Sequence, residues 1–219
     1  MQVAENRGRG RPKTAPDEAQ RAIIVAAATR LFLQKGYGNA TTDDLTCCCK
    51  ISKQTLYRLF PNKCALFAAV VTASKPSWLD FTVADDSMPL EEALARIFCI
   101  DISAEADQER LDLIRLVVTE SQYSPELARI IRENGADVSR AELACWLTRQ
   151  AQQGRIIVDD ADSLARMLID MIFGAIILKG GGDMAWPGSL DRKAHIRRCI
   201  SIFLNGARPR RGVAQPAKP

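Results

Sequence analysis

The feature that most constrains the fold is the spacing of the apolar residues, which has a helical period along almost the whole chain. Apolar side chains recur every three to four positions, and no segment alternates apolar and polar residues as a half-buried strand would. The stripe at the start of the chain, for example, consists of Ile23, Ile24, Ala27, Ala28, Leu31 and Phe32. We therefore expect an all-α fold of about nine helices.

Residues 41–60 predict two short helices separated by a turn of about three residues. Thr41 is suited to be an N-cap with Asp44 at the third helical position, close to a capping box. Ser52 is suited to cap the second helix, whose sequence is "KQTLYRLF". Two helices this short and this close in sequence form a helix-turn-helix, a unit that binds DNA through its second helix.

Other helices are predicted on both sides of this unit. The first runs from about Asp17 to Lys35 and stops at Gly36, and Pro61 is expected to open a helix that reaches Ser74. Five further helices are expected at about 89–102, 107–121, 125–153 with a break near Gly135, 160–179 and 189–205.

Charge divides the chain more sharply than the net value of +4 indicates. Residues 1–63 hold 11 Lys/Arg and 5 Asp/Glu, whereas residues 64–206 hold 15 and 21. A basic first third on an acidic body indicates that one part meets a polyanion, with chance unevenness as the alternative. We expect a disordered basic arm at 1–16, a helix-turn-helix DNA-binding domain at 17–63, a larger helical ligand-binding and dimerisation domain at 64–206 and a disordered basic tail at 207–219.

Several classes of protein are disfavoured by the sequence. The most apolar segment, "MLIDMIFGAIILKGGG", is interrupted by Asp170 and is too short to span a membrane, and the N-terminus lacks the apolar core of a secretory signal. Seven irregularly spaced cysteines indicate free thiols in a reducing cytoplasm. With one histidine, no nucleophile–base pair, no metal-ligand spacing and no phosphate-binding loop, we expect no catalytic residues, no metal and no cofactor.

Residues 21–67 resemble the DNA-binding domain of the tetracycline-repressor (TetR) family of bacterial transcription regulators. The similar elements, in order, are the Ala/Leu/Phe-rich first helix, Gly36-Tyr37, Thr41-Thr42, Ser52, Leu56, Tyr57, Phe60 and Lys63. The segment "LIRLVVTESQYSPELARII" resembles the ligand-binding domain of AcrR-like and AefR-like members, many of which repress efflux pumps. The resemblance implies a cytoplasmic, nucleoid-associated homodimer on a near-palindromic DNA operator.

The second helix of the unit has one face suited to reading bases. Leu56, Leu59 and Phe60 are expected to point inward. Glutamine can bind adenine bidentately and Arg or Lys can bind guanine, while residues at helix ends fix phosphates. For Tyr57 the alternative is a core aromatic, and for Lys63 a solvated surface charge. The predicted DNA-binding residues of the helix-turn-helix domain are Thr41, Thr42, Ser52, Lys53, Gln54, Thr55, Tyr57, Arg58 and Lys63.

The arm "RGRGRPK" adds a second possible contact with DNA. Arg7, Arg9 and Arg11 are separated by glycines and resemble an AT-hook, which lies in a narrow minor groove. We include Arg9 and Arg11 among the predicted DNA-binding residues. The alternative is a basic tail that binds any phosphate.

The turn between the two short helices departs from the family pattern. The family usually has Ala-Gly-Val-Ser there, and this chain has Cys49-Lys50-Ile51-Ser52. If Lys50 takes the positive φ that glycine accepts, the strain is on the order of 1 kcal/mol. An altered turn is the alternative.

Three consecutive cysteines, Cys47 to Cys49, end the first of the two short helices. Adjacent helical residues point about 100° apart, so the three cannot face one metal ion. We expect them to pack as small apolar side chains. The alternative is a thiol switch, in which nearby Lys50 and Lys53 lower a thiol pKa and oxidation weakens DNA binding.

The second domain is expected to hold a cavity and a dimer interface. We expect a small apolar inducer to bind in this cavity. The predicted lining residues, each with core packing as the alternative, are Phe98, Ile102, Leu113, Val117, Trp146, Met167, Met171 and Phe173. The residues predicted to face a second subunit are Leu164, Leu168, Ala175, Ile196, Ile200 and Phe203. The function predicted is a repressor that a ligand releases from DNA, and the alternative is a TetR-like DNA binder controlled by a protein partner or by thiol oxidation.

Overall fold

The computed structural model describes residues 17–177 and 192–207, and this part of the chain is helical and contains no strand. Its helices are α1 (Asp17–Asn39), α2 (Thr42–Cys49), α3 (Lys53–Leu59), α4 (Lys63–Ser74), α5 (Leu90–Ile97), α6 (Ala104–Tyr123), α7 (Pro125–Ile131), α8 (Asp137–Gln152), α9 (Ala161–Ile177) and α10 (Arg192–Ala207). A π turn at Arg132–Ala136 joins α7 and α8, so the described helices form nine rods and the predicted all-α class is confirmed. The predicted arm, with Arg9 and Arg11, and residues 208–219 lie outside the described part.

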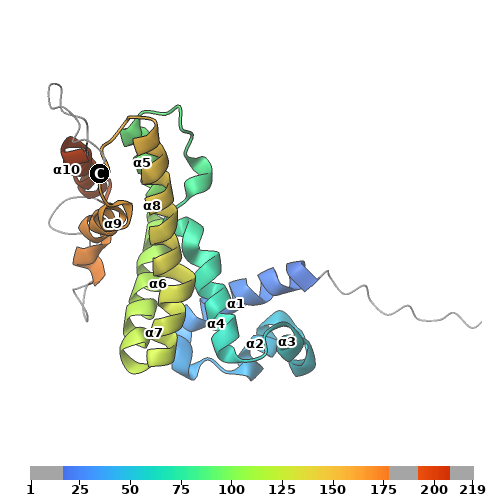
Figure 1. The fold of residues 1–219 in the computed structure, drawn as a ribbon. Helices are drawn as coiled ribbons and strands as arrows, with labels where there is room; N and C mark the ends of the chain where they lie inside the picture. The colour runs from blue at the N-terminus through green and yellow to red at the C-terminus, as the bar shows by residue number, and fades with distance from the viewer. Residues whose placement is uncertain (1–16, 178–191, 208–219) are drawn as a thin grey trace, which may run out of the picture.

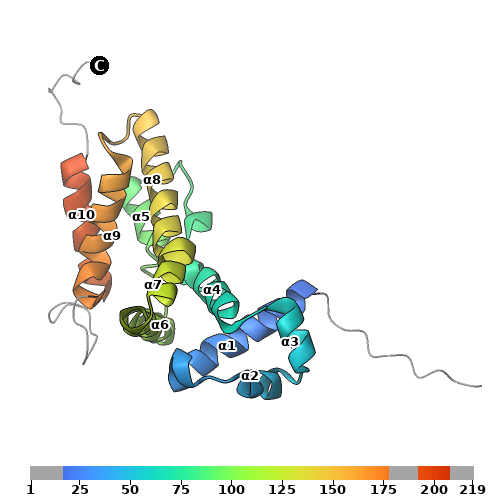
Figure 2. The same cartoon turned by 60° about the horizontal axis from the view of Figure 1, so that its bottom comes forward.

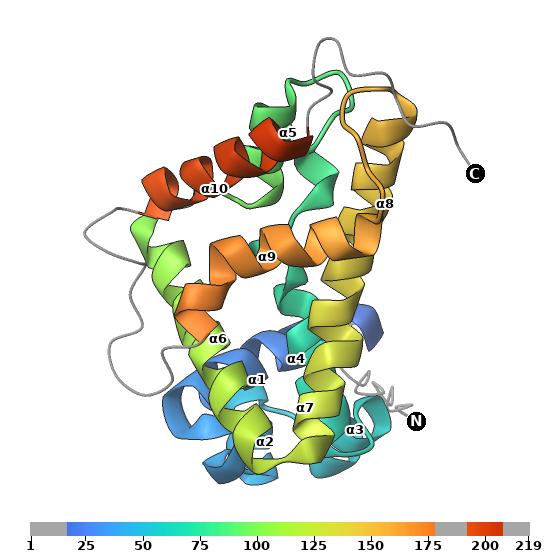
Figure 3. The same cartoon turned by 60° about the vertical axis from the view of Figure 1, so that its left-hand side comes forward.

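The helices form two groups, shown in Figure 1. Helices α1 to α4 form a small head at one end, and α5 to α10 form a longer body. Figure 2 shows α2 and α3 on the side of the head that faces away from the body. In Figure 3, α9 and α10 lie in front of the other helices and form one outer side of the body.

Two apolar cores hold these groups together. The head core is built from α1 to α4 and also includes three side chains of the body, Leu116 of α6 and Leu127 and Ile130 of α7. The body core is built around the fully buried Leu94, Leu143 and further apolar residues of α5, α6, α8, α9 and α10. Head and body therefore meet through continuous apolar packing.

The predicted caps of the helix-turn-helix are confirmed. Thr41 and Asp44 form a capping box in which each side chain accepts a hydrogen bond from the other residue's backbone N–H, at 3.1 and 3.0 Å. The Ser52 hydroxyl accepts from the Thr55 N–H at 3.0 Å. These bonds satisfy donors that a helix start leaves unpaired, so both short helices have defined beginnings.

Of the two alternatives for the turn, the structure shows a left-handed Lys50. Its φ is 53° and its ψ is 45°, and its N–H bonds back to the Cys47 carbonyl at 3.3 Å. The next N–H, of Ile51, bonds to the Thr46 carbonyl at 3.1 Å. The turn keeps its shape with a lysine where glycine would be less strained.

Three helix ends differ from the predictions. Gly36, with φ 77°, breaks α1 as expected, but helical structure resumes to Asn39. Helix α4 begins at Lys63 and not at Pro61, because Asn62 is the N-cap and its side chain accepts from the Ala65 N–H at 2.7 Å. Helix α5 ends at Ile97, short of the predicted 102, and Cys99 beyond it has φ 52°.

The strain at Lys50 predicts a stabilising substitution. We expect Lys50→Gly to raise the free energy of unfolding by about 1 kcal/mol, because glycine accepts the left-handed conformation. Chemical denaturation measures this change. Lys50→Ala is the control, since it removes the charge and keeps the Cβ; equal stability of the two variants would contradict the role of strain.

Candidate nucleic-acid interface and internal cavity

Helix α3 is fixed on the head by its inward face. Leu56, Leu59 and Phe60 are buried as predicted. The Arg21 guanidinium of α1 lies 4.4 Å from the centre of the Phe60 ring and donates a hydrogen bond to the Leu59 carbonyl at 2.5 Å. One arginine thus ties the C-terminal end of α3 to α1, which the apolar pattern did not indicate.

The outward face of α3 carries the side chains predicted to read bases. Lys53, Gln54 and Arg58 are exposed, and Thr55 is half-buried beside the Ser52 hydroxyl at 3.0 Å. These residues lie on one solvent-facing side of the head, which suits a surface that enters a DNA groove.

Both cations on this face are held by carboxylates of the same chain. Lys53 pairs with Asp43 at 2.7 Å. Arg58 donates two hydrogen bonds to Asp17, at 2.6 and 2.9 Å, and these bonds hold the pKa of Asp17 below its usual value. DNA phosphates or bases that bind Arg58 must therefore compete with Asp17, a partner that the sequence did not reveal.

Three residues predicted to contact phosphates are brought together between α2, α3 and α4. Thr42, Tyr57 and Lys63 line one small hollow. Tyr57 is 47% exposed, which excludes the core-aromatic interpretation. Thr41 lies at the start of α2, with its side chain engaged in the capping box.

Lys63 is more constrained than a solvated surface charge. Its ammonium lies 4.4 Å from the centre of the Tyr37 ring and donates to the Gly38 carbonyl at 3.2 Å. Partial burial lowers the pKa of Lys63. The cation is thus held in a fixed place beside the hollow, next to Tyr57.

The three cysteines do not behave alike. Cys49 is half-buried and packs against the head core, as predicted, and burial raises its thiol pKa instead of lowering it. Cys47 and Cys48 are exposed, so the prediction that they pack is wrong. The helical step of about 100° explains this result, because only one of three successive residues can face α1.

The body contains an apolar cavity of about 240 Å³. It lies among α6, α9, the π turn and the segment after α4. Its lining residues are Trp78, Leu79, Ile114, Val117, Val118, Ser121, Ile131, Ala136, Ser139, Ile169 and Phe173. The polar side-chain groups in this lining are the hydroxyls of Ser121 and Ser139 and the indole N–H of Trp78.

Two of the eight predicted lining residues, Val117 and Phe173, lie in the cavity wall. Phe98, Leu113 and Trp146 are buried but do not belong to that lining, and Met167 is 55% exposed. Ile102 and Met171 are half-buried and are also not part of it. Ile114 and Ser121 could have been predicted, because they lie one helical turn before and after Val117 on the same face of α6. Trp78 lies outside the helices, so helical periodicity does not indicate its place.

The residues predicted to face a second subunit are mostly buried within one chain. Leu168, Ile196, Ile200 and Phe203 belong to the body core, and Leu164 packs against it. For the four buried positions, Leu168, Ile196, Ile200 and Phe203, the prediction is wrong, because these side chains pack α9 and α10 against the rest of their own chain. Leu164 is half-buried, so its place in an interface stays a prediction. The Ala175 side chain lies outside the described residues.

Two contacts connect the neighbourhood of the cavity to the head. The Tyr37 N–H, at the break in α1, donates to Glu120 of α6 at 2.9 Å, and Glu120 directly precedes the cavity residue Ser121. The second contact is at the π turn. The cavity residue Ile131 directly precedes this turn, and the cavity residue Ala136 is its last residue. Gly135 of the turn packs on α4 so closely that an added Cβ would lie 3.0 Å from Val71. Segments that form the cavity wall are therefore in direct contact with α1 and α4 of the head.

Within the residues that the structure describes, no group of three or more His, Cys, Asp or Glu side chains is arranged to hold a metal ion. No helix among them is long and apolar enough to cross a membrane.

The head presents α3, a short helix with a Ser52 N-cap, to solvent and is joined to a larger helical body. This arrangement is typical of a helix-turn-helix DNA-binding regulator. Family models agree with this class. Residues 24–70 match the model of "Bacterial regulatory proteins, tetR family", and residues 92–206, more than half of the chain, match "AefR-like transcriptional repressor, C-terminal domain". The chain belongs to the TetR family of transcription regulators, and it is a regulator and not an enzyme.

Individual relatives support the same assignment. The "DNA-binding transcriptional repressor TetR" of Mycobacteroides abscessus is 27% identical over 179 residues, covering 80% of this chain and 92% of its own. The regulator UidR of Escherichia coli K12 is 25% identical over 177 residues, covering 78% and 88%.

Solved structures share the fold. A TetR-family regulator from Mesorhizobium loti aligns with a TM-score of 0.70 at 21% identity, covering 90% of this chain and all of its own. The "Flavonoid-responsive Regulator FrrA" aligns with a TM-score of 0.61 at 26% identity, covering 88% and 99%.

The pair between Arg58 and Asp17 generates a prediction for DNA affinity. We expect Asp17→Asn to raise the affinity for duplex DNA about threefold, because it frees Arg58 and removes one carboxylate from the surface. Fluorescence anisotropy with labelled DNA measures this. Glu18→Gln removes the same charge without touching Arg58; an equal rise in that control would show that net charge alone is responsible.

Proposed function

We propose that the protein is a ligand-responsive repressor that acts as a homodimer. In this proposal two α3 helices bind a near-palindromic operator, and a small apolar molecule entering the cavity releases the DNA. The regulated genes would include an efflux pump or related functions, as in many proteins that the sequence resembles. The observation that carries the proposal is the apolar cavity whose wall continues directly into contacts with the head.

The DNA contacts proposed follow from the exposed side of the head. Gln54 and Arg58 would read base edges, and Thr42, Tyr57 and Lys63 would hold phosphates on either side of the groove. A C2 dimer would place two such surfaces about 34 Å apart, one turn of DNA.

The coupling proposed depends on the π turn and on α4. Gly135 packs so closely on α4 that an added Cβ would lie 3.0 Å from Val71, so a ligand that displaces Ile131 or Ala136 would push on α4. Helix α4 carries part of the head core, so its shift would change the orientation of α3. A ligand can shift the equilibrium between the DNA-binding and the released conformation only as far as its affinities for these two conformations differ.

The cavity supports a small inducer with few polar groups. Its volume of about 240 Å³ lies below the smallest volumes typical of pockets for drug-sized ligands, roughly 300 Å³. The name of FrrA states that this related protein responds to flavonoids, which are flat and aromatic. That precedent favours a flat apolar compound here.

The dimer proposed uses the outward sides of α9 and α10. Met167 of α9 and Ile202 of α10 are 55% and 57% exposed, whereas the neighbouring apolar residues of both helices face the body core. Figure 3 shows both helices on one outer side, where they would meet the same two helices of a second copy.

This interface predicts the effect of a charge. We expect Ile202→Glu to convert the dimer to a monomer and to lower operator affinity at least tenfold, because two buried carboxylates would face one another. Light scattering after gel filtration measures the mass. Ile157→Glu, at another exposed apolar residue outside the two helices, is the control and should remain dimeric; a dimeric Ile202→Glu would place the interface elsewhere.

The proposed function is tested by titrating the purified protein onto its own upstream DNA, at several salt concentrations, and then adding flat apolar compounds. We expect specific binding and release by at least one compound that also raises the melting temperature of the free protein. Tight binding that no compound reverses would contradict ligand control and favour control by another protein.

Thiol oxidation is the second candidate for control, because Cys47 and Cys48 are exposed on α2, next to the turn before α3. Oxidation there would add bulk and polarity beside the DNA-binding surface. The same titration after mild oxidation, with thiol modification verified by mass spectrometry, decides this: unchanged affinity excludes the switch.

A further inference from the structure

Arg110 is a buried cation at one end of the cavity. It is 1% exposed and lies on the same face of α6 as the cavity residues Ile114, Val117 and Ser121, one turn closer to the start of the helix. Its guanidinium lies 5.1 Å from the centre of the Phe173 ring. It also donates to the Trp78 carbonyl at 3.2 Å. Both Phe173 and Trp78 line the cavity, so the guanidinium lies directly behind the cavity wall.

Some of the hydrogen-bond donors of Arg110 have no acceptor in the protein. Its Nη2 group donates to the carbonyls of Trp78 and Phe98, at 3.2 and 3.4 Å. Its Nε and Nη1 groups have no hydrogen-bond partner, and no carboxylate forms an ion pair with it, among residues 17–177 and 192–207. A buried guanidinium in this state is unfavourable unless something else binds it.

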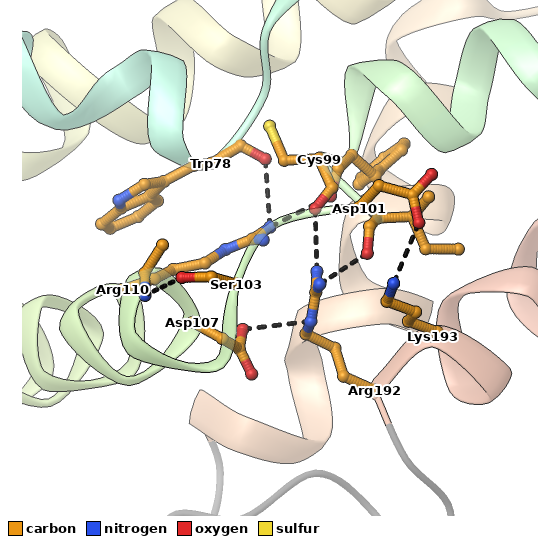
Figure 4. A network of polar contacts seen from close by, with 11 residues as sticks. Trp78, Cys99, Asp101, Ser103, Asp107, Arg110, Arg192 and Lys193 are labelled. Carbon is orange, nitrogen blue, oxygen red and sulfur yellow. Dashed lines mark hydrogen bonds and ion pairs between the residues drawn. The ribbon is translucent and has the colours of Figure 1, made fainter.

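The carboxylates nearby are engaged by other cations, as Figure 4 shows. Asp107 pairs with Arg192 of α10 at 3.2 Å, and Asp101 pairs with Lys193 at 3.0 Å. Arg192 also donates to the carbonyls of Cys99 and Ile100, at 2.9 and 2.6 Å. Asp107 is near Arg110 as well, but its ion pair is with Arg192, so Arg110 forms no ion pair of its own among the described residues. Burial lowers the pKa of Arg110 to about 10, which keeps it charged at neutral pH.

We propose that Arg110 is the anion-binding group of the cavity, and that the ligand is a small carboxylic acid with an apolar frame. The frame would occupy the space lined by Ile114, Val117 and Val118. The carboxylate would reach between Trp78 and Phe173 and accept hydrogen bonds from the unused N–H groups of Arg110. The proposal rests on the cavity being the ligand site of the proposed function, and it adds the chemical class of the ligand.

An acid fits this site better than other classes of compound. A neutral ligand would leave the guanidinium unpaired, and an amine would be repelled by Arg110 and by nearby Arg192. The cavity lining itself supplies few polar groups, so most of the ligand must be hydrocarbon.

The test compares acids with amides of the same shape. Three pairs are titrated onto the full-length dimer by calorimetry: octanoate and octanamide, 4-phenylbutyrate and 4-phenylbutyramide, and 2-naphthoate and 2-naphthamide. We expect at least one acid to bind about tenfold or more tightly than its amide. If no acid in the panel exceeds its amide tenfold, the proposal is wrong.

Two variants assign the effect to the residue. Arg110→Met removes the charge and keeps much of the volume, and it should equalise the affinities of the acid and its amide. Arg115→Met, at an exposed arginine of the same helix, should keep the preference of the parent protein. Melting curves verify that both variants are folded. If Arg110→Met is unfolded, Arg110→Gln, which also removes the charge, replaces it, and an undiminished preference for the acid in the folded variant that is tested overturns the assignment.

Operator release separates this inference from the proposed function. If an amide releases the DNA as effectively as its acid, ligand control stands and the acid subsite fails. If acids bind with the expected preference but never release DNA, the subsite stands and ligand control fails.

Discussion

The packing that joins α4 to both groups of helices is the constraint on which the rest of the structure depends. A head of four short helices has little apolar surface of its own to bury, and small units of this size are marginally stable alone. The head core is completed by Leu116, Leu127 and Ile130 from the body. The orientation of α3 therefore depends on the packing of the head against α6 and α7, and in the proposed mechanism the same packing would transmit changes in the body to the head.

The polar contacts also differ between the head and the body. On the exposed face of α3, Lys53 and Arg58 are paired with exposed carboxylates, and such exposed ion pairs are weak enough for a DNA phosphate to replace. Inside the body, Arg192 is paired with Asp107, whereas Arg110 has donors without partners. We expect the exposed pairs near α3 to weaken or strengthen the proposed contact with DNA, and the buried cation beside the apolar cavity to favour a ligand with one negative group.

Local signals predicted the fold well. The capping box at Thr41, the Ser52 cap and the left-handed Lys50 are determined by nearby residues, so the sequence was sufficient to place the helix-turn-helix. Apolar periodicity also predicted the helices, but it cannot distinguish residues that face a core, a cavity or a second subunit. For this reason Ile196 and Phe203 were assigned to an interface although they hold α10 on its own chain, and Trp146 was assigned to the cavity although it is packed elsewhere. Partners distant in sequence, such as Asp17 for Arg58 and Glu120 for Tyr37, depend on the tertiary arrangement and had no local signal.

The central claim is that the exposed face of α3 recognises DNA. The most direct measurement compares the affinity of the parent and of a Gln54→Ala, Tyr57→Ala variant for the upstream DNA, by fluorescence anisotropy at constant salt. A Gln152→Ala, Tyr123→Ala variant, changed at exposed residues of the body, is the matched control. We predict that the α3 variant loses at least tenfold in affinity while it melts at the same temperature, and that the control binds as the parent does. An α3 variant that binds as tightly as the parent would contradict the claim.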